Sequence, residues 1–364
     1  MSITKVTDAG LDRNRIVTPL IINGDMSVAQ RSTSVTGVGD GDTGYHTLDR
    51  WRFSEGGDNS TVFTMSQDTN VPTGQGFAKS LKMDVTTADG APVSSDSMFL
   101  QQRFEGQNLQ LLKKGTSSAE KITVAFWVSS SKTGTYILEL QDSDNTRNCS
   151  QSYTISSADT WEKKVVVFPA DTTGAIDNDN ANSFEVNWWL LAGTDFTSGT
   201  LATSFASRTN ANRAVGQVNV GDNTSNNFYM TGCQMEIGEF DTNTIPSFPF
   251  ESFENNLRKC QRYFYRREGE NSYGPGAQGM QIGSSNTMIQ GYHPVKMRSA
   301  PSMSVDGTWN MEVGTTAVTW NCPSTRTSTT AYSSEQSAGN SDGSAAIVYA
   351  NNDTDAAIIG DAEL

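Results

Sequence analysis

The stretch SFEVNWWLL, residues 183–191, indicates how this chain folds. It combines alternating polar and apolar residues with a short apolar run, which is typical of a β-strand. Similar stretches recur at KITVAFWV (121–128), TYILELQ (135–141) and KKVVVF (163–168), and turn-rich spacers such as EGGDN and TADGAP separate the strands. Regular short strands joined by turns predict an all-β jelly-roll sandwich from Pro19 to about Phe240.

One helix is predicted after these strands. The segment DTNTIPSFP (241–249) holds two prolines within four residues, which end any strand. A helix is then expected from Glu251 to about Arg267, because apolar residues recur there at helical spacing and basic residues gather towards its end. A helix this short needs a partner, so its stripe is expected to pack on a domain or on its copies around a three-fold axis. The predicted assembly residues are Phe253, Leu257, Cys260 and Phe264.

Strand signals return after the helix, in stretches such as AVTWNC and AAIVYA. We therefore predict a jelly-roll sandwich, a short connecting helix and a second, smaller β-sandwich domain. The expected parts are an N-terminal attachment arm (1–20), the jelly-roll domain (21–245), a linker with its amphipathic helix (246–268) and a C-terminal β domain (269–364).

The chain is acidic, and this limits its partners. It has 26 Lys and Arg against 40 Asp and Glu, which gives a formal net charge of −14. Nucleic-acid binding needs a basic face, so we predict no nucleic-acid partner. No apolar run is long enough to cross a membrane, and the first residues lack the pattern of a signal peptide, so we expect neither membrane insertion nor standard secretion. The wide spacing of the four cysteines fits no zinc motif and predicts reduced thiols in a protein made in cytoplasm.

The sequence offers no convincing catalytic motif. Its histidines are His46 and His293, and no G-x-S-x-G elbow accompanies them. Paired carboxylates serve glycosidases, but acids at strand edges also arise by chance in a sandwich. The acids that we considered for this role are Glu105, Glu185, Glu236 and Glu239. We therefore predict that the protein is not an enzyme.

Two Asp-rich loops, 39–44 and 171–182, offer the hard oxygen ligands that calcium prefers. Neither loop has the late Glu of an EF-hand. A solvated turn is the favoured reading of each loop, and a structural calcium ion is the alternative, with no other cofactor expected. The candidate calcium ligands are Asp40, Asp42, Asp177 and Asp179.

Tryptophan rings stack on the apolar faces of sugars, so exposed tryptophans are candidate glycan contacts. Trp188 and Trp189 are adjacent, so on a strand they face opposite sides, and one of the two is a candidate for exposure. The candidate ligand-binding residues are Trp188, Trp189, Trp309 and Trp320.

Several short motifs stand at the two ends of the predicted jelly roll. They are INGDMSVAQR (22–31), LDRW (48–51), CQMEIG (233–238), PFE (249–251) and CQRYF (260–264). Their order and spacing resemble those of a family of phage tail-fibre and other virion proteins, common in marine phages such as podoviruses. The resemblance implies a jelly roll similar to carbohydrate-binding modules, and it carries over no catalytic residues.

The residues of the opening motifs themselves indicate a structural role. The Asn23-Gly24-Asp25 turn is expected to start a strand. Gln30, Arg31 and the run Asp49-Arg50-Trp51 are expected to form a polar cluster that fixes the ends of strands.

Taken with the resemblance, these observations predict a virion structural protein made in the host cytoplasm. The expected form is a homotrimeric tail fibre or tail-associated protein that contributes to host attachment through a surface glycan. Its partners would be its own copies, other tail or capsid proteins, and that glycan. The receptor-reading tip is expected after about residue 270, where such proteins vary. The alternatives are a capsid decoration or fibre-anchoring adaptor protein without its own ligand and, less favoured, a glycan-degrading tailspike.

Overall fold

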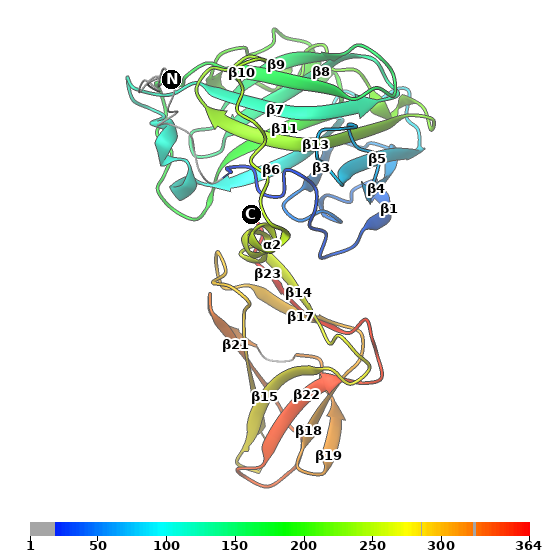
Figure 1. Cartoon of the computed structure of the whole chain (residues 1–364), viewed down its shortest axis with the longest axis vertical. Coiled ribbons are helices and arrows are strands. Elements are labelled where there is room, and N and C mark those ends of the chain that lie inside the picture. Colours follow the sequence, from blue (N-terminus) through cyan, green and yellow to red (C-terminus); the bar gives the residue numbers. More distant parts are fainter. Residues whose placement is uncertain (1–18, 285, 323–324) are drawn as a thin grey trace, which may run out of the picture. The chain divides into compact units, whose positions relative to one another are not determined.

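The computed structural model describes residues 19–284, 286–322 and 325–364 (Figure 1). The chain forms two compact units, Met1–Glu251 and Ser252–Leu364, and each is described by itself. Almost all of the predicted arm, 1–20, lies outside the described residues. Strands dominate both units, and every strand pair is antiparallel, so the predicted all-β class is confirmed.

In the described residues, the first unit is a sandwich of two antiparallel sheets. Its strands are β1 (Ser34–Gly39), β2 (Gly44–Tyr45), β3 (Arg52–Gly56), β4 (Val62–Asp68), β5 (Ser80–Thr87), β6 (Ser97–Glu105), β7 (Ile122–Ser130), β8 (Gly134–Asp142), β9 (Arg147–Ile155), β10 (Glu162–Phe168), β11 (Asn182–Ala192), β12 (Ala206–Ser207) and β13 (Asn227–Ile237). Sheet A has the order β1-β4-β5-β13-β7-β10 and sheet B the order β12-β9-β8-β11-β6-β3-β2. The chain passes repeatedly from one sheet to the other, as a jelly-roll sandwich requires.

Short helical turns lie in the connections of the first unit. They are η2 (Gly106–Asn108), η3 (Gln110–Leu112), α1 (Thr194–Thr197), η4 (Asn210–Asn212) and η5 (Val220–Asp222). The last three belong to the long connection between β11 and β13, and part of that connection covers the outer face of sheet B, as the hydrogen bonds below show.

Aromatic side chains fill the core between sheets A and B. The Trp188 ring lies 5.2 Å from Trp51 and 5.8 Å from Phe126, measured between ring centroids. Strand alternation produces this core, because Val186 and Trp188 of β11 point inward while their neighbours point out. Each fully buried side chain of this size contributes about 1.5–3 kcal/mol to stability.

The opening motifs form the predicted polar cluster. The Asn23 side chain donates to the carbonyls of Val28 (2.8 Å) and Asp49 (3.0 Å) and accepts from the Val28 amide (2.9 Å). The Trp51 indole N–H donates to the Asn23 carbonyl at 2.9 Å. The Gln30 amide donates to Asp49 Oδ1 at 3.1 Å, and Arg31 lies 3.9 Å from the same carboxylate. These contacts fix a chain segment that has no long strand of its own.

The opening and closing motifs meet at Gly24 and Cys233. The Cys233 amide donates to the Gly24 carbonyl at 2.9 Å. A Cβ atom at Gly24 would lie only 2.1 Å from the Cys233 carbonyl oxygen, so only glycine allows the two backbones to approach this closely. The opening and closing motifs are therefore parts of one structural junction.

The predicted helix is shorter than its apolar stripe suggested. Helix α2 spans Phe253–Gln261, with Ser252 as its N-cap. Neither α2 nor any other helix of the described residues is long and apolar enough to span a membrane. Phe264 lies outside the helix, in strand β14 (Phe264–Glu268), where it pairs with Asp361. The prediction of one helix to Arg267 is wrong, because pairing with the C-terminal strand overrides the local spacing. Phe253 is 57% exposed, whereas Cys260 and Phe264 are buried and Leu257 is half-buried.

In the described residues, the second unit also consists of two antiparallel sheets. Its further strands are β15 (Pro275–Ile282), β16 (Asn286–Tyr292), β17 (Ser302–Asp306), β18 (Trp309–Val313), β19 (Thr316–Thr319), β20 (Arg326–Thr327), β21 (Ala331–Gln336), β22 (Ala345–Ala350) and β23 (Ala357–Asp361). Sheet C has the order β14-β23-β17, and sheet D the order β19-β18-β22-β15-β16-β21-β20. Their core holds Trp309, Trp320, Val348 and Ile358. The second, smaller β domain of the prediction is therefore present, and it includes the helix.

Candidate functional site

The four tryptophans predicted to contact sugar are all buried. Trp188 lies in the sandwich core, and Trp309 and Trp320 pack edge to face in the core of the second unit. Trp189 points out of sheet B, as alternation predicted, but Phe196 packs on its ring and the Arg213 guanidinium lies 5.1 Å from its centroid. None of the four tryptophans exposes more than 1% of its surface, so the ligand-binding prediction for them is wrong.

Polar side chains cover the outer face of sheet B. Asn187 of β11 stands opposite Gln101 of β6 and Glu139 of β8, so a polar row crosses three strands. Gln101 Nε2 donates to Asn187 and to Glu185, at 2.8 Å each. Arg213, from the connection after β11, donates two hydrogen bonds to the Glu139 carboxylate, at 2.8 and 2.9 Å. These groups satisfy one another inside the fold, so we assign them a structural role.

The histidines do not form a triad. The ring nitrogen Nε2 of His46 lies 3.2 Å from the Asp42 carbonyl. His293 Nδ1 lies 3.0 Å from the Tyr265 hydroxyl, and its Nε2 lies 3.1 Å from the Ser328 carbonyl. In the part of the chain that the structure describes, neither imidazole bonds to a Ser or Thr hydroxyl, which nucleophilic catalysis would need.

The acids considered for glycoside hydrolysis are occupied or buried. Glu185 accepts hydrogen bonds from Gln101 and Gln141, and Glu239 forms an ion pair with Lys121. The two others, Glu105 and Glu236, are buried. No acid of this set is paired with another in a way that favours hydrolysis, and the absence of catalysis stays a prediction.

The calcium candidates lie on exposed turns. The residues are Asp40, Asp42, Asp177 and Asp179. Asp42 faces the imidazole of His46 at 3.8 Å. Across the described ranges, no three or more His, Cys, Asp or Glu side chains gather as a metal site. Calcium binding at these loops therefore stays a prediction.

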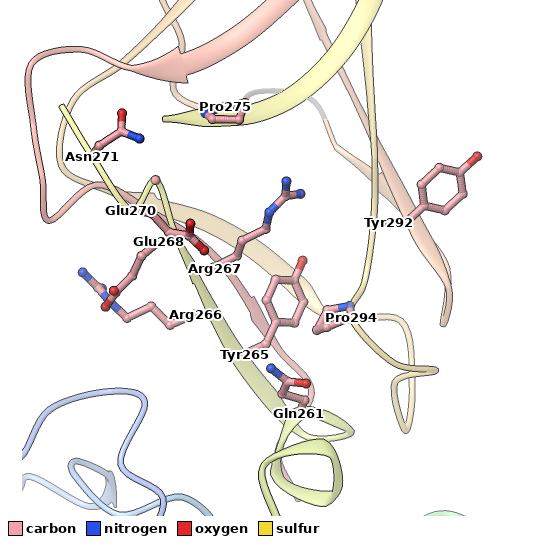
Figure 2. A pocket seen from close by; sticks show the side chains of 11 residues that line it. Gln261, Tyr265, Arg266, Arg267, Glu268, Glu270, Asn271, Pro275, Tyr292 and Pro294 are labelled. Carbon is pink, nitrogen blue, oxygen red and sulfur yellow. The ribbon is translucent and has the colours of Figure 1, made fainter. Parts of the chain in front are cut away.

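A hollow of about 610 Å³ opens on the second unit (Figure 2). Strand β14 and the turn after it line one side, and the ends of β15 and β16 contribute the rest. Its wall combines charged side chains with tyrosine and proline rings. The residues that matter below are Tyr265, Arg267, Glu268, Glu270, Pro275, Tyr292 and Pro294.

A second hollow, of about 280 Å³, shares Tyr292 with the first. Gln290, Arg326 and Tyr332 are among its lining residues. Tyr292 exposes 76% of its surface, because alternation along β16 turns Ile289 inward and Tyr292 out. The stretch NTMIQGYHPV (286–295) is typical of a strand, but nothing in it indicates that Tyr292 lines two hollows.

Three packed rings support the two hollows. The ring centroids of Tyr265 and His293 lie 5.5 Å apart, and those of His293 and Tyr332 lie 5.8 Å apart. Burial raises the pKa of Tyr265 well above its ordinary value and that of Tyr332 to about 12, and it lowers the pKa of His293. All three rings are therefore neutral near pH 7, and they form a rigid, uncharged support.

The chemistry of this surface suits a polar, ring-shaped ligand. An exposed tyrosine face offers stacking to apolar C–H groups, while arginine, glutamate and amide side chains around it offer hydrogen-bond donors and acceptors. Sequence analysis missed these residues, because Arg267 was assigned to the end of a helix and Tyr292 carried no motif. We call the two hollows and the tyrosine between them the Tyr292 site.

Comparison with known proteins gives a limited likeness. No protein-family model matches the chain, and no curated protein matches it. Among solved structures, the enzymatically active domain of bacteriophage CBA120 tailspike protein 4 is similar at 14% identity and TM-score 0.28, over 52% of this chain and only 19% of that one. A family 11 carbohydrate-binding module from Clostridium thermocellum, in complex with a β-1,3-1,4-mixed-linked tetrasaccharide, is similar at 9% identity and TM-score 0.29, over 58% of this chain and 98% of that one. Function is therefore argued from the chain's own residues.

Proposed function

We propose that this protein binds a bacterial surface glycan through the Tyr292 site, as a non-catalytic structural component of a phage particle. One observation carries the binding proposal: a tyrosine ring that is 76% exposed stands between two hollows. A tyrosine ring presents a flat apolar face and has few side-chain torsions to immobilise on binding. The surrounding charged and amide groups can form the hydrogen bonds that fix the orientation of a bound sugar.

A particle protein would gain affinity from its copies. A shallow site on one chain binds weakly, and several copies on one particle raise the overall avidity without new contacts. We therefore retain the homotrimer and the tail location as part of the proposal, supported by the motif resemblance. Light scattering should give three times the 39.4 kDa chain mass, and a monomer mass in solution would contradict the trimer.

The binding proposal is tested with two exposed tyrosines. Purified full-length protein is applied to an array of purified bacterial polysaccharides and lipopolysaccharides, alongside Tyr292→Ala and Tyr273→Ala. Tyr273 is 62% exposed in the same unit but lines neither hollow, so it is a matched control. Loss of stacking should weaken binding by about 1–2 kcal/mol for Tyr292→Ala only, roughly five- to thirtyfold. Equal binding by the two variants, or no binding by the wild type, would count against the site.

The non-enzymatic part of the proposal has its own test. Polysaccharides that the protein binds are incubated with it and their chain length is followed by size-exclusion chromatography. We expect no shortening, since the acids first considered for hydrolysis are buried or occupied by other groups. Shortened chains would make the protein a glycan-degrading spike.

The remaining alternative is a capsid decoration or adaptor protein without its own ligand. Electron microscopy of particles with this chain gold-labelled separates the two. Label at the tail supports the attachment role, whereas label on the head would contradict it.

A further inference from the structure

We propose that Arg267 forms a subsite for the carboxylate of an acidic sugar residue, beside Tyr292. The inference rests on the proposed glycan binding and names the class of sugar that the same site selects. It starts from a cation for which the fold provides no counter-ion.

The Arg267 guanidinium is free to bind a ligand. Among the described residues it makes no hydrogen bond and no ion pair. Its neighbour Arg266 is different, because it pairs with Asp306, lies 3.6 Å from Glu268 and donates to the Asp355 carbonyl at 2.7 Å. The two arginines point to opposite faces of β14, since side chains alternate along a strand. Both arginines line the larger hollow, but only Arg266 has acceptors within the described part of the fold.

Arg267 extends into the larger hollow. Figure 2 shows its side chain reaching into the space bordered by Pro275, Tyr292 and Pro294. Nothing in the fold requires an arginine there for packing, because Arg267 is an exposed residue. An exposed cation aimed into a concave surface is well placed for a ligand and poorly placed for stability.

A second donor of the Tyr292 site has no partner. The Tyr332 hydroxyl, in the wall of the smaller hollow, is buried and has no hydrogen-bond partner in the described structure. The Tyr265 hydroxyl, by contrast, bonds to His293. Glu268 and Glu270 also line the larger hollow, but among the described residues neither pairs with Arg267.

The charges around the hollow favour a single carboxylate. A guanidinium presents parallel N–H groups that match the two oxygens of a carboxylate, which gives a bidentate pair. Glu268 and Glu270 also line the hollow, so its charge is not strongly positive. An isolated monoanion fits this balance better than a phosphate monoester or a dense polyanion. Tyr292 lines the same hollow, so a ring of the same glycan can stack on it.

The test compares two arginines on matched polymers. The probes are a uronic-acid-containing capsular polysaccharide that the array identifies, the same polymer with its carboxyls reduced to hydroxymethyl groups, and a phosphodiester-linked polysaccharide. Full-length wild type, Arg267→Gln, Arg267→Lys and Arg258→Gln are compared by biolayer interferometry. Arg258 is exposed on helix α2 of the same unit and lines neither hollow, so it is the control.

Arg267→Gln should weaken binding of the acidic polymer roughly ten- to hundredfold, as expected for loss of a charge-assisted hydrogen-bonded pair. Arg267→Lys keeps the charge without the fork and should give an intermediate loss. Arg258→Gln should stay within about twofold of wild type. Wild type and Arg267→Gln should bind the reduced polymer equally, because neither then has a carboxylate to pair.

The two proposals fail in different ways. Binding that depends on Tyr292 but is unchanged by Arg267→Gln would overturn the carboxylate subsite and leave the glycan site intact. Preference of the wild type for the phosphodiester polymer over the acidic one would also overturn the subsite. Absence of binding to every polysaccharide of the array would overturn the proposed function and the subsite together.

Discussion

The substitution Gly24→Ala tests whether the junction of the opening and closing motifs holds the first unit together. The added Cβ atom would lie 2.1 Å from the Cys233 carbonyl oxygen and 3.2 Å from the carbonyl carbon. The first distance is roughly 1 Å shorter than the closest ordinary carbon–oxygen contact. The opposing atoms are backbone, so they cannot move away by a change of rotamer. The two segments must separate.

Separation costs free energy in two ways. Overpacking of a close contact costs about 1–3 kcal/mol. The 2.9 Å hydrogen bond from the Cys233 amide to the Gly24 carbonyl is strained or lost, and an unsatisfied buried amide costs about 1–3 kcal/mol. The free energy of unfolding of the first unit should therefore fall by about 2–5 kcal/mol, which lowers its Tm by roughly 5–15 °C in a unit of this size.

Gly90→Ala is the matched control. Gly90 also has an ordinary backbone conformation, but a Cβ atom there would meet nothing within 4 Å. Its effect should stay within about 0.5 kcal/mol. Differential scanning calorimetry of the full-length protein measures both variants. Equal transition temperatures for the two variants would refute the reasoning. They would mean that the close approach of the two backbones at Gly24 is not what makes the substitution destabilising.

Three further outcomes follow from buried charges and thiols. Arg213→Met leaves the buried Glu139 carboxylate without its cation, so the free energy of unfolding should fall by about 3–5 kcal/mol in urea titrations; a loss under about 1 kcal/mol would contradict a tight pair. At Asp171, burial disfavours ionisation, but hydrogen bonds from Arg147 and other groups outweigh it and lower the pKa of the carboxyl. A carboxyl whose pKa is lower in the folded state stabilises the fold at pH values above its pKa in the unfolded chain, about 3.9. This contribution is lost as the pH falls through the folded-state pKa. Below about pH 4, the Tm of Asp171→Asn should therefore fall less steeply than the Tm of the wild type. Burial raises the pKa of the Cys149 thiol to about 12, and all four cysteines are buried. The native protein should therefore react with Ellman's reagent at about pH 8 far more slowly than the unfolded protein does. Rapid labelling of the native protein would contradict this.

The strands were predictable because their signal is local. Alternation over 183–191 correctly placed Trp188 and Trp189 on opposite faces of β11. Burial of the outward residue was not predictable in the same way. Trp189 is covered by Phe196 and Arg213, which come from a connection whose path no periodicity describes. A strand pattern determines where a side chain points, and not what lies over it.

The end of the helix was missed for a similar reason. The spacing from Phe253 to Phe264 is helical, yet Phe264 pairs with Asp361, almost a hundred residues later in the chain. A strand partner so distant leaves no mark in the local sequence. The error had a functional consequence, because in a helix Arg266 and Arg267 would both serve the helix dipole. In β14 they face opposite sides, and although both line the hollow, only Arg266 has ion-pair partners in the described residues.

Two arginines show how a structural cation differs from a functional one. Arg213 is 8% exposed and donates to both oxygens of the Glu139 carboxylate, so the fold itself supplies the group that an arginine fork recognises. Arg267 has the same donors, stands in a hollow and finds no acceptor in the described residues. Buried polar groups are rarely left unpaired in a folded protein. An exposed guanidinium in a hollow can bond to water instead, so leaving it without a protein partner costs little stability. On sheet B the fold therefore supplies the partner of Arg213, whereas in the proposed Tyr292 site Arg267 has a partner only if a ligand binds.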